Sequence, residues 1–189
     1  GTAQMEEVEF GDKVRAFQGD GNRQYLTGLK LGGERVLILI DGSASMLGET
    51  LEDSQYLRDM VDDQKKKSPK WQWALRTVEW LLAALPPSSR FQVYIFNTRA
   101  WAALAGSDGQ WLDAADSLDM EQAIAGLRDY PPSSGTSLIN GFGAIADFDG
   151  RPDNIFLLTD GLPTQGKKPT GYREVSGQQR RKLFLDALN

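Results

Sequence analysis

The chain has 189 residues, a formal net charge of −5 at pH 7, and neither cysteine nor histidine. Disulfides, thiolate nucleophiles, zinc–sulfur sites, Ser-His-Asp catalysis and histidine-ligated metals are therefore excluded. The acidic balance argues against a nucleic-acid partner, because binding to phosphates requires a basic face. No apolar run approaches the roughly 20 residues that cross a bilayer, so we expect no direct membrane insertion. The length suits one domain with a well-filled core.

The first 34 residues are predicted to form an extension that contains a β-hairpin. Two strand-like runs, 14–18 and 23–31, flank the turn-rich segment Gly19-Asp-Gly-Asn22. The pair Gly32-Gly33 then interrupts the pattern before the next strand. We therefore divide the chain into a hairpin extension, 1–34, and a main domain, 35–189.

The main domain opens on a run of branched apolar residues that ends in the sequence Asp41-Gly-Ser-Ala-Ser45. Such a run is typical of a strand buried on both faces of a sheet. Its carboxyl end is where open α/β sheets bind ligands. Asp41, Ser43 and Ser45 offer only oxygen atoms there, and oxygen ligands favour Mg²⁺, Mn²⁺ or Ca²⁺.

Helices and strands then alternate along the chain. The patterns predict a surface helix around Leu57, and thereafter a helix from Pro69 to Leu85 with Ser68 as its cap, strands at 90–97 and 100–104, a helix from Asp119 to Leu127, a loop at 131–136, a helix at 137–148, a strand at 154–160 and a helix at 178–188. This alternation predicts an α/β fold whose mostly parallel, doubly wound, Rossmann-like sheet carries helices on both faces.

Three of the predicted loops carry further oxygen-bearing side chains. Asp41-Gly-Ser-Ala-Ser45 ends the first strand, Thr136 precedes a helix, and Asp160 ends the strand at 154–160. Together they resemble the metal-ion-dependent adhesion site (MIDAS) of von Willebrand factor A (VWA) domains, which combines Asp-x-Ser-x-Ser with a threonine and an aspartate on two further loops. All five positions match in the expected order.

The resemblance implies a role for each of these residues. Ser43, Ser45 and Thr136 would be direct ligands of Mg²⁺, with Mn²⁺ or Ca²⁺ as alternatives, while Asp41 and Asp160 would orient them. Neutral hydroxyls leave a divalent ion short of negative charge, so the ion would bind an Asp or Glu side chain of a protein partner. The implied function is a non-enzymatic adhesion or scaffolding module.

The chain departs from the family pattern in two places. Residues 47–68 form a longer link after the serine loop than is usual, and we treat them as an insertion. The family normally continues beyond the Asp160 loop with further helices and strands, so we expect a domain that is truncated at its C-terminus or completed by another segment. The strand at 155–158 would then lie at an edge of the sheet.

Two other functions remain open at this point. A metal-assisted hydrolase or phosphotransferase would use Asp41 and Asp160, although no histidine supplies a base. A structural subunit would have its site filled by a neighbouring domain of the same protein. Bacterial VWA-type proteins include cytoplasmic and membrane-anchored members, and the segment Arg23-Gln-Tyr-Leu-Thr-Gly28 resembles the membrane-anchored ones, which favours the cell envelope as location. The oligomeric state and the partner's identity are left open by the sequence.

Overall fold

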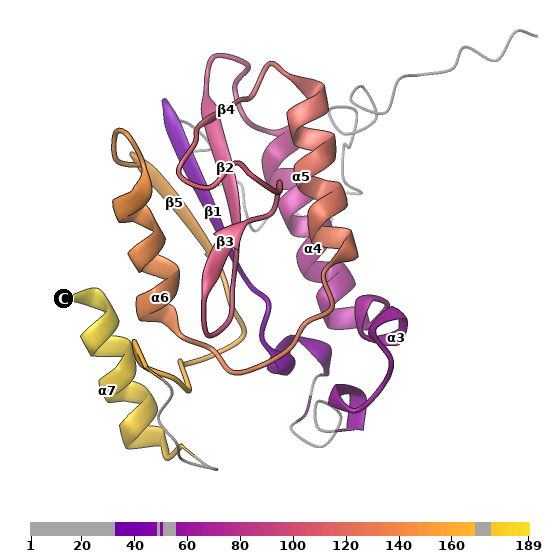
Figure 1. The fold of residues 1–189 in the computed structure, drawn as a ribbon, viewed down its shortest axis with the longest axis vertical. Coiled ribbons are helices and arrows are strands. Elements are labelled where there is room, and N and C mark those ends of the chain that lie inside the picture. Colours follow the sequence, from indigo (N-terminus) through magenta and orange to yellow (C-terminus); the bar gives the residue numbers. More distant parts are fainter. Residues whose placement is uncertain (1–32, 49, 51–55, 169–174) are drawn as a thin grey trace, which may run out of the picture.

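The computed structural model describes residues 33–48, 50, 56–168 and 175–189 (Figure 1). The predicted hairpin at 14–31 lies outside these residues. The described elements are, in order, β1 (Arg35–Asp41), a 3-10 helix (Ala44–Leu47), α3 (Asp62–Lys66), α4 (Pro69–Ala83), β2 (Arg90–Phe96), β3 (Ala100–Ala102), β4 (Leu112–Asp113), α5 (Ser117–Asp129), α6 (Leu138–Gly143), a second 3-10 helix (Ala144–Asp147), β5 (Asn154–Leu158) and α7 (Gly177–Leu188). The predicted alternation of helices and strands is confirmed.

The sheet has the strand order β3-β2-β1-β5, with β4 also paired to β2. β1 runs parallel to both of its neighbours, and Asp41 at its end lies opposite Phe96 at the end of β2. Among the described strands, only the short β3 and β4 pair with β2 in the antiparallel sense. The predicted mostly parallel sheet is therefore confirmed, and its carboxyl-terminal edge brings Asp41 close to the loop that follows β5.

Each face of the sheet is covered by its own pair of helices (Figure 1). Val36, Ile38 and Ile40 point from β1 into one hydrophobic cluster, which α4 and α5 cover. Leu37 and Leu39 point into the other, which is packed against α6 and α7. Because successive side chains of a strand point to opposite faces, a strand in this position must be apolar throughout. The burial of β1 on both faces therefore explains why its sequence from Val36 to Ile40 is apolar at every position.

β5 forms one edge of the sheet in the described part of the chain, as the sequence predicted. Its Ile155 side chain is 39% exposed, whereas Phe156 is buried against the α4 and α5 side. The domain boundaries and the extent of the insertion 47–68 stay predictions. None of the helices in the described ranges is long and apolar enough to span a membrane.

One predicted helix start and one predicted capping bond need correction. The helix predicted from Asp119 begins at Ser117, because Asp116 is the N-cap and its carboxylate accepts hydrogen bonds from the backbone N–H groups of Leu118 and Asp119. Ser68 does occupy the N-cap position of α4, but its hydroxyl makes no capping bond and is buried without a hydrogen-bond partner. The proline that follows it suits the first turn through its fixed φ angle.

Close packing between α5 and the sheet predicts a sharp difference between two glycines. A Cβ atom on Gly126 of α5 would lie 1.9 Å from the Ala103 carbonyl oxygen, whereas one on Gly143 would meet nothing within 4 Å. We expect Gly126→Ala to lower the free energy of unfolding by about 2–3 kcal/mol, as overpacking does. The control Gly143→Ala should be neutral or stabilising by up to about 1 kcal/mol. Urea denaturation measures both, and equal effects would contradict the described packing.

Candidate metal site

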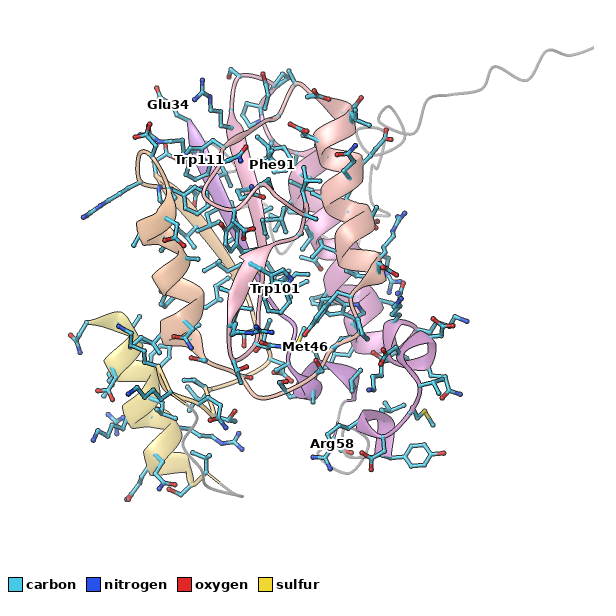
Figure 2. All side chains as sticks on the ribbon, in the orientation of Figure 1. Glu34, Met46, Arg58, Phe91, Trp101 and Trp111 are labelled. Carbon is cyan, nitrogen blue, oxygen red and sulfur yellow. The ribbon has the colours of Figure 1, made fainter. Side chains whose placement is uncertain are left out.

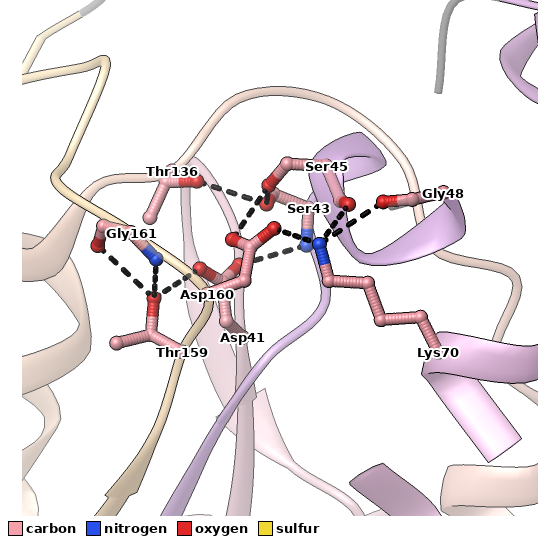
Figure 3. Close-up of polar contacts among 9 residues, drawn as sticks. All are labelled: Asp41, Ser43, Ser45, Gly48, Lys70, Thr136, Thr159, Asp160 and Gly161. Carbon is pink, nitrogen blue, oxygen red and sulfur yellow. Dashed lines mark hydrogen bonds and ion pairs between the residues drawn. The ribbon is translucent and has the colours of Figure 1, made fainter. Parts of the chain in front are cut away.

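Three loops meet at the carboxyl-terminal edge of the sheet. Figure 2 places Met46, just beyond the first loop, at the opposite end of β1 from Glu34. Because β1 and β5 are parallel neighbours, the segment that ends in Ser45 and the segment that carries Asp160 leave the sheet side by side. The loop that contains Thr136 completes the group, and Figure 3 shows the five predicted side chains together. Their predicted convergence is thus seen in the structure.

The three hydroxyl groups form a chain of hydrogen bonds that ends on a carboxylate (Figure 3). Thr136 Oγ1 donates to Ser43 Oγ at 2.8 Å, and Ser43 Oγ lies 2.9 Å from Ser45 Oγ. Ser45 Oγ donates to Asp160 Oδ1 at 2.9 Å. Because the Ser45 hydroxyl has only one proton and donates it to Asp160, Ser43 must be the donor in the Ser43–Ser45 hydrogen bond. The chain therefore runs in one direction, from Thr136 to Asp160.

Asp41 forms the floor of the site. Its side chain is fully buried, and it accepts hydrogen bonds from Ser43 N–H at 2.9 Å and from Thr159 Oγ1 at 2.7 Å. Burial raises the pKa of Asp41 from 3.8 to about 6, although the bonds from Thr159 and Ser43 act in the opposite direction. The negative charge of the nearby Asp160 carboxylate acts in the same direction as burial and also raises the pKa of Asp41.

Asp160 lies at the rim, and a lysine holds it there. Lys70 Nζ lies 2.5 Å from Asp160 Oδ2, and both side chains are 19% exposed. The same ammonium group donates to the backbone carbonyls of Ser45 and Gly48, each at 3.0 Å. The first turn of α4 thus contributes to the site through the Lys70 side chain. The beginning of the predicted insertion contributes to it through the Gly48 carbonyl, which accepts a hydrogen bond from Lys70.

The Asp41–Ser45 loop is fixed by hydrogen bonds on both sides. Gly42 N–H donates to the Phe96 carbonyl at 2.8 Å, and the Gly42 carbonyl accepts from Ser133 N–H at 2.8 Å and from the Tyr130 hydroxyl at 2.9 Å. A Cβ atom at Gly42 would lie 2.6 Å from the Tyr130 ring, so a larger residue there would force its neighbours to shift. Ala44 N–H donates at 3.0 Å to the carbonyl of Ser134, whose φ is +69°.

Tyr130 belongs to an aromatic group beneath this loop. Its ring lies 5.9 Å from Trp71 and 5.4 Å from Trp101, in edge-on arrangements. Asn97 Nδ2 donates to the Tyr130 hydroxyl at 3.0 Å. The tyrosine therefore links the buried core to the backbone that separates Asp41 from Ser43.

The Thr136 loop is fastened to the segment that follows β5. The Thr136 carbonyl accepts from the N–H groups of Thr164 and Gln165, both at 2.9 Å, and Thr136 N–H donates to Thr164 Oγ1 at 3.0 Å. With the bonds from the serine loop to Ser133 and Ser134, all three loops are linked through their backbones. The site is thus held in place by hydrogen bonds outside its own hydroxyl chain.

Comparison with solved structures finds similar architecture in proteins of low sequence identity. A von Willebrand factor type A protein from Catenulispora acidiphila shares 16% identity with this chain, with a TM-score of 0.54 over 82% of this chain and 30% of that one. The chain has the von Willebrand factor A fold. Two structures of proximal thread matrix protein 1 from the mussel byssus, one with a zinc-occupied MIDAS motif, match less well, at 19% and 20% identity and TM-scores of 0.43 and 0.45.

The VWA likeness is one of structure. No family model and no curated protein matches the sequence. The chain also spans only 30% to 35% of the length of the solved proteins named above.

The oxygen atoms of this VWA fold suit a small, hard divalent cation. Neighbouring ligands of an octahedral Mg²⁺ ion lie about 3 Å apart, because each is roughly 2.1 Å from the metal. The two hydroxyl–hydroxyl separations at Ser43 are 2.9 and 2.8 Å. Within the described ranges no group of three or more His, Cys, Asp or Glu side chains is arranged to hold a metal ion.

Sequence reasoning missed two residues of the site. Thr159 donates to Asp41, and its place directly before Asp160 on a strand end was a signal that could have been used. Lys70 gave no such signal, because it comes from a helix and reaches the site only through its long side chain.

The buried carboxylate makes Asp41→Asn an informative variant. The amide can keep the bond from Ser43 N–H and turn its NH₂ toward Thr159 Oγ1, which also lies 3.3 Å from the Gly161 carbonyl. The raised pKa of Asp41 means that the ionised group opposes folding at pH 7. In EDTA we therefore expect Asp41→Asn to be more stable than the wild type at pH 7, by up to about 3 kcal/mol.

The pH dependence provides the control. A group with a raised folded-state pKa adds stability as the pH falls from about 6 towards 3.8, so the advantage of Asp41→Asn should shrink across that window. Thermal unfolding of both proteins in EDTA at pH 7 and pH 4.5 measures the difference. If Asp41→Asn were less stable than the wild type at pH 7, the interactions of the Asp41 carboxylate would outweigh its loss of hydration, which would contradict this prediction.

Proposed function

We propose that this chain is a divalent-cation-dependent protein-binding module. Ser43, Ser45 and Thr136 would hold Mg²⁺, or Mn²⁺ or Ca²⁺, and the ion would capture an Asp or Glu side chain of a partner protein. Asp41 and Asp160 would orient the hydroxyl groups. The observation that carries this proposal is the hydroxyl chain, whose oxygen–oxygen separations of 2.8 and 2.9 Å are close to the roughly 3 Å between neighbouring ligands of a small octahedral ion.

The burial of the site residues is consistent with a ligand arriving from one side. Asp41, Ser43 and Thr136 are buried, whereas the Asp160 side chain at the rim is partly exposed. Three neutral ligands would leave most of the ion's charge unbalanced, and the nearest full negative charges would belong to Asp41 and Asp160. A carboxylate from outside would therefore bind more strongly than water.

The enzymatic alternative receives less support from the geometry. Asp41 is fully buried, and each of its carboxylate oxygens accepts a hydrogen bond, which leaves it poorly placed to attack a substrate. Lys70 is the nearby amine, and its three contacts use all the N–H groups of an ammonium ion. Neither group is free to act as a base.

Isothermal titration calorimetry with Mg²⁺ and Mn²⁺ tests the proposal. The wild type should bind both ions, and Thr136→Val should weaken binding at least tenfold, because it removes a ligand oxygen with little change in shape. The matched control is Thr77→Val on α4, which also removes one hydroxyl hydrogen bond but away from the site. Thr77→Val should bind metal as the wild type does.

A peptide with a single glutamate completes the experiment. It should bind the wild type only when metal is present, and replacement of the glutamate by glutamine should abolish binding. Equal metal affinity in the wild type, Thr136→Val and Asp41→Ala would contradict the proposed site. Turnover of phosphoesters that is lost in Asp41→Ala would favour the enzyme instead.

A further inference from the structure

Lys70 places a fixed positive charge at the rim of the candidate metal site. An ammonium group has three N–H donors, and Lys70 has three acceptors, one from the Asp160 carboxylate and two from the backbone of the serine loop (Figure 3). Two of those acceptors are carbonyls, so the ammonium would keep most of its contacts even if the Asp160 carboxylate turned away. The charge therefore belongs to the site's fixed structure.

The position of Lys70 along α4 also restricts its movement. The residue lies in the first turn of the helix, directly after Pro69 and directly before Trp71, which is fully buried. Only 19% of the Lys70 side chain is exposed. A lysine held in this way at both its backbone and its nitrogen acts as a constant charge rather than as a mobile surface group.

The lysine changes the total charge that a metal ion would meet. The described site holds two carboxylates, Asp41 and Asp160, and one ammonium group, so its formal charge is −1 when both acids are ionised. With a neutral residue at position 70 it would be −2. Since ligand charge tunes divalent-cation affinity, the ammonium must weaken binding of the ion by itself.

The same charge has the opposite effect on an anion that arrives with the metal. A site of charge −1 that holds a divalent ion has a net charge of +1, whereas a site of charge −2 would be neutral. We propose that Lys70 makes the site depend on its acidic ligand: it lowers the affinity for the metal alone and strengthens the mutual enhancement of metal and carboxylate binding. Such coupling is reciprocal by thermodynamic necessity. This inference rests on the proposed metal site.

The test compares Mn²⁺ affinities in two salts of equal ionic strength, sodium chloride and sodium acetate, with acetate as the carboxylate probe. In chloride, Lys70→Met should bind Mn²⁺ roughly tenfold more tightly than the wild type. A change of this size lies within the range of affinity changes that is usual when two binding sites influence each other. In acetate, the wild type should gain more affinity than Lys70→Met does. Lys70→Arg keeps the charge and should behave as the wild type.

Lys66→Met is the matched control. It removes one lysine charge from an ion pair with Asp129, an 86% exposed residue outside the site. Its Mn²⁺ affinity should equal that of the wild type in both salts, which separates a local effect from a change in net charge. Thermal unfolding in EDTA checks that every variant is folded.

The outcomes separate this inference from the proposed function. If the wild type binds Mn²⁺ through Thr136 but folded Lys70→Met binds no more tightly in chloride, the role of Lys70 is overturned and the metal site stands. If Lys70→Met and Lys70→Arg both bind more weakly, the lysine holds the loops in place rather than setting the charge, and the inference is also overturned. If no variant binds Mn²⁺, both proposals fail.

Discussion

The parallel pairing of β1 with β5 brings together two of the three loops that form the candidate metal site. Parallel neighbours end at the same edge of a sheet, so Asp41 and Asp160, 119 positions apart in the chain, leave the sheet side by side. The burial of β1 on both faces fixes where that edge lies. Val36, Ile38 and Ile40 pack on one side and Leu37 and Leu39 on the other, so a slip of the strand in one direction would draw Asp41 into the apolar core.

That constraint has an electrostatic cost at the end of the strand. A strand without solvent contact delivers Asp41 into a fully buried position, where its pKa rises to about 6. The protein offsets part of the cost with two hydrogen bonds and places its nearest ammonium at the rim, beside Asp160. The floor of the site is thus left negative while the rim is partly neutralised, and this difference is what would draw a divalent ion inwards.

The sequence predicted those features that follow from periodicity and from short local motifs. Unbroken apolar runs identified β1 and β5, and three oxygen-bearing loops identified five site residues that the structure brings together. The predicted start of α5 was wrong because Asp116, and not Asp119, is the cap, and its carboxylate accepts the hydrogen bonds from Leu118 N–H and Asp119 N–H. The two-residue strand β4 lacks any periodic signal and was missed. Lys70 could not be predicted because its role depends on where α4 lies relative to β5.

The aromatic group beneath the serine loop has a spectroscopic consequence. Trp71 is fully buried, and its indole lies against the ring of Tyr130, which also contacts Trp101. The Tyr130 hydroxyl is bonded to the Gly42 carbonyl, between the aspartate and the first serine of the site. Any shift of that peptide group must move the phenol ring and alter the surroundings of both indoles. The fold therefore contains an intrinsic fluorescence reporter, which would make the position of the loop visible in solution without an added label.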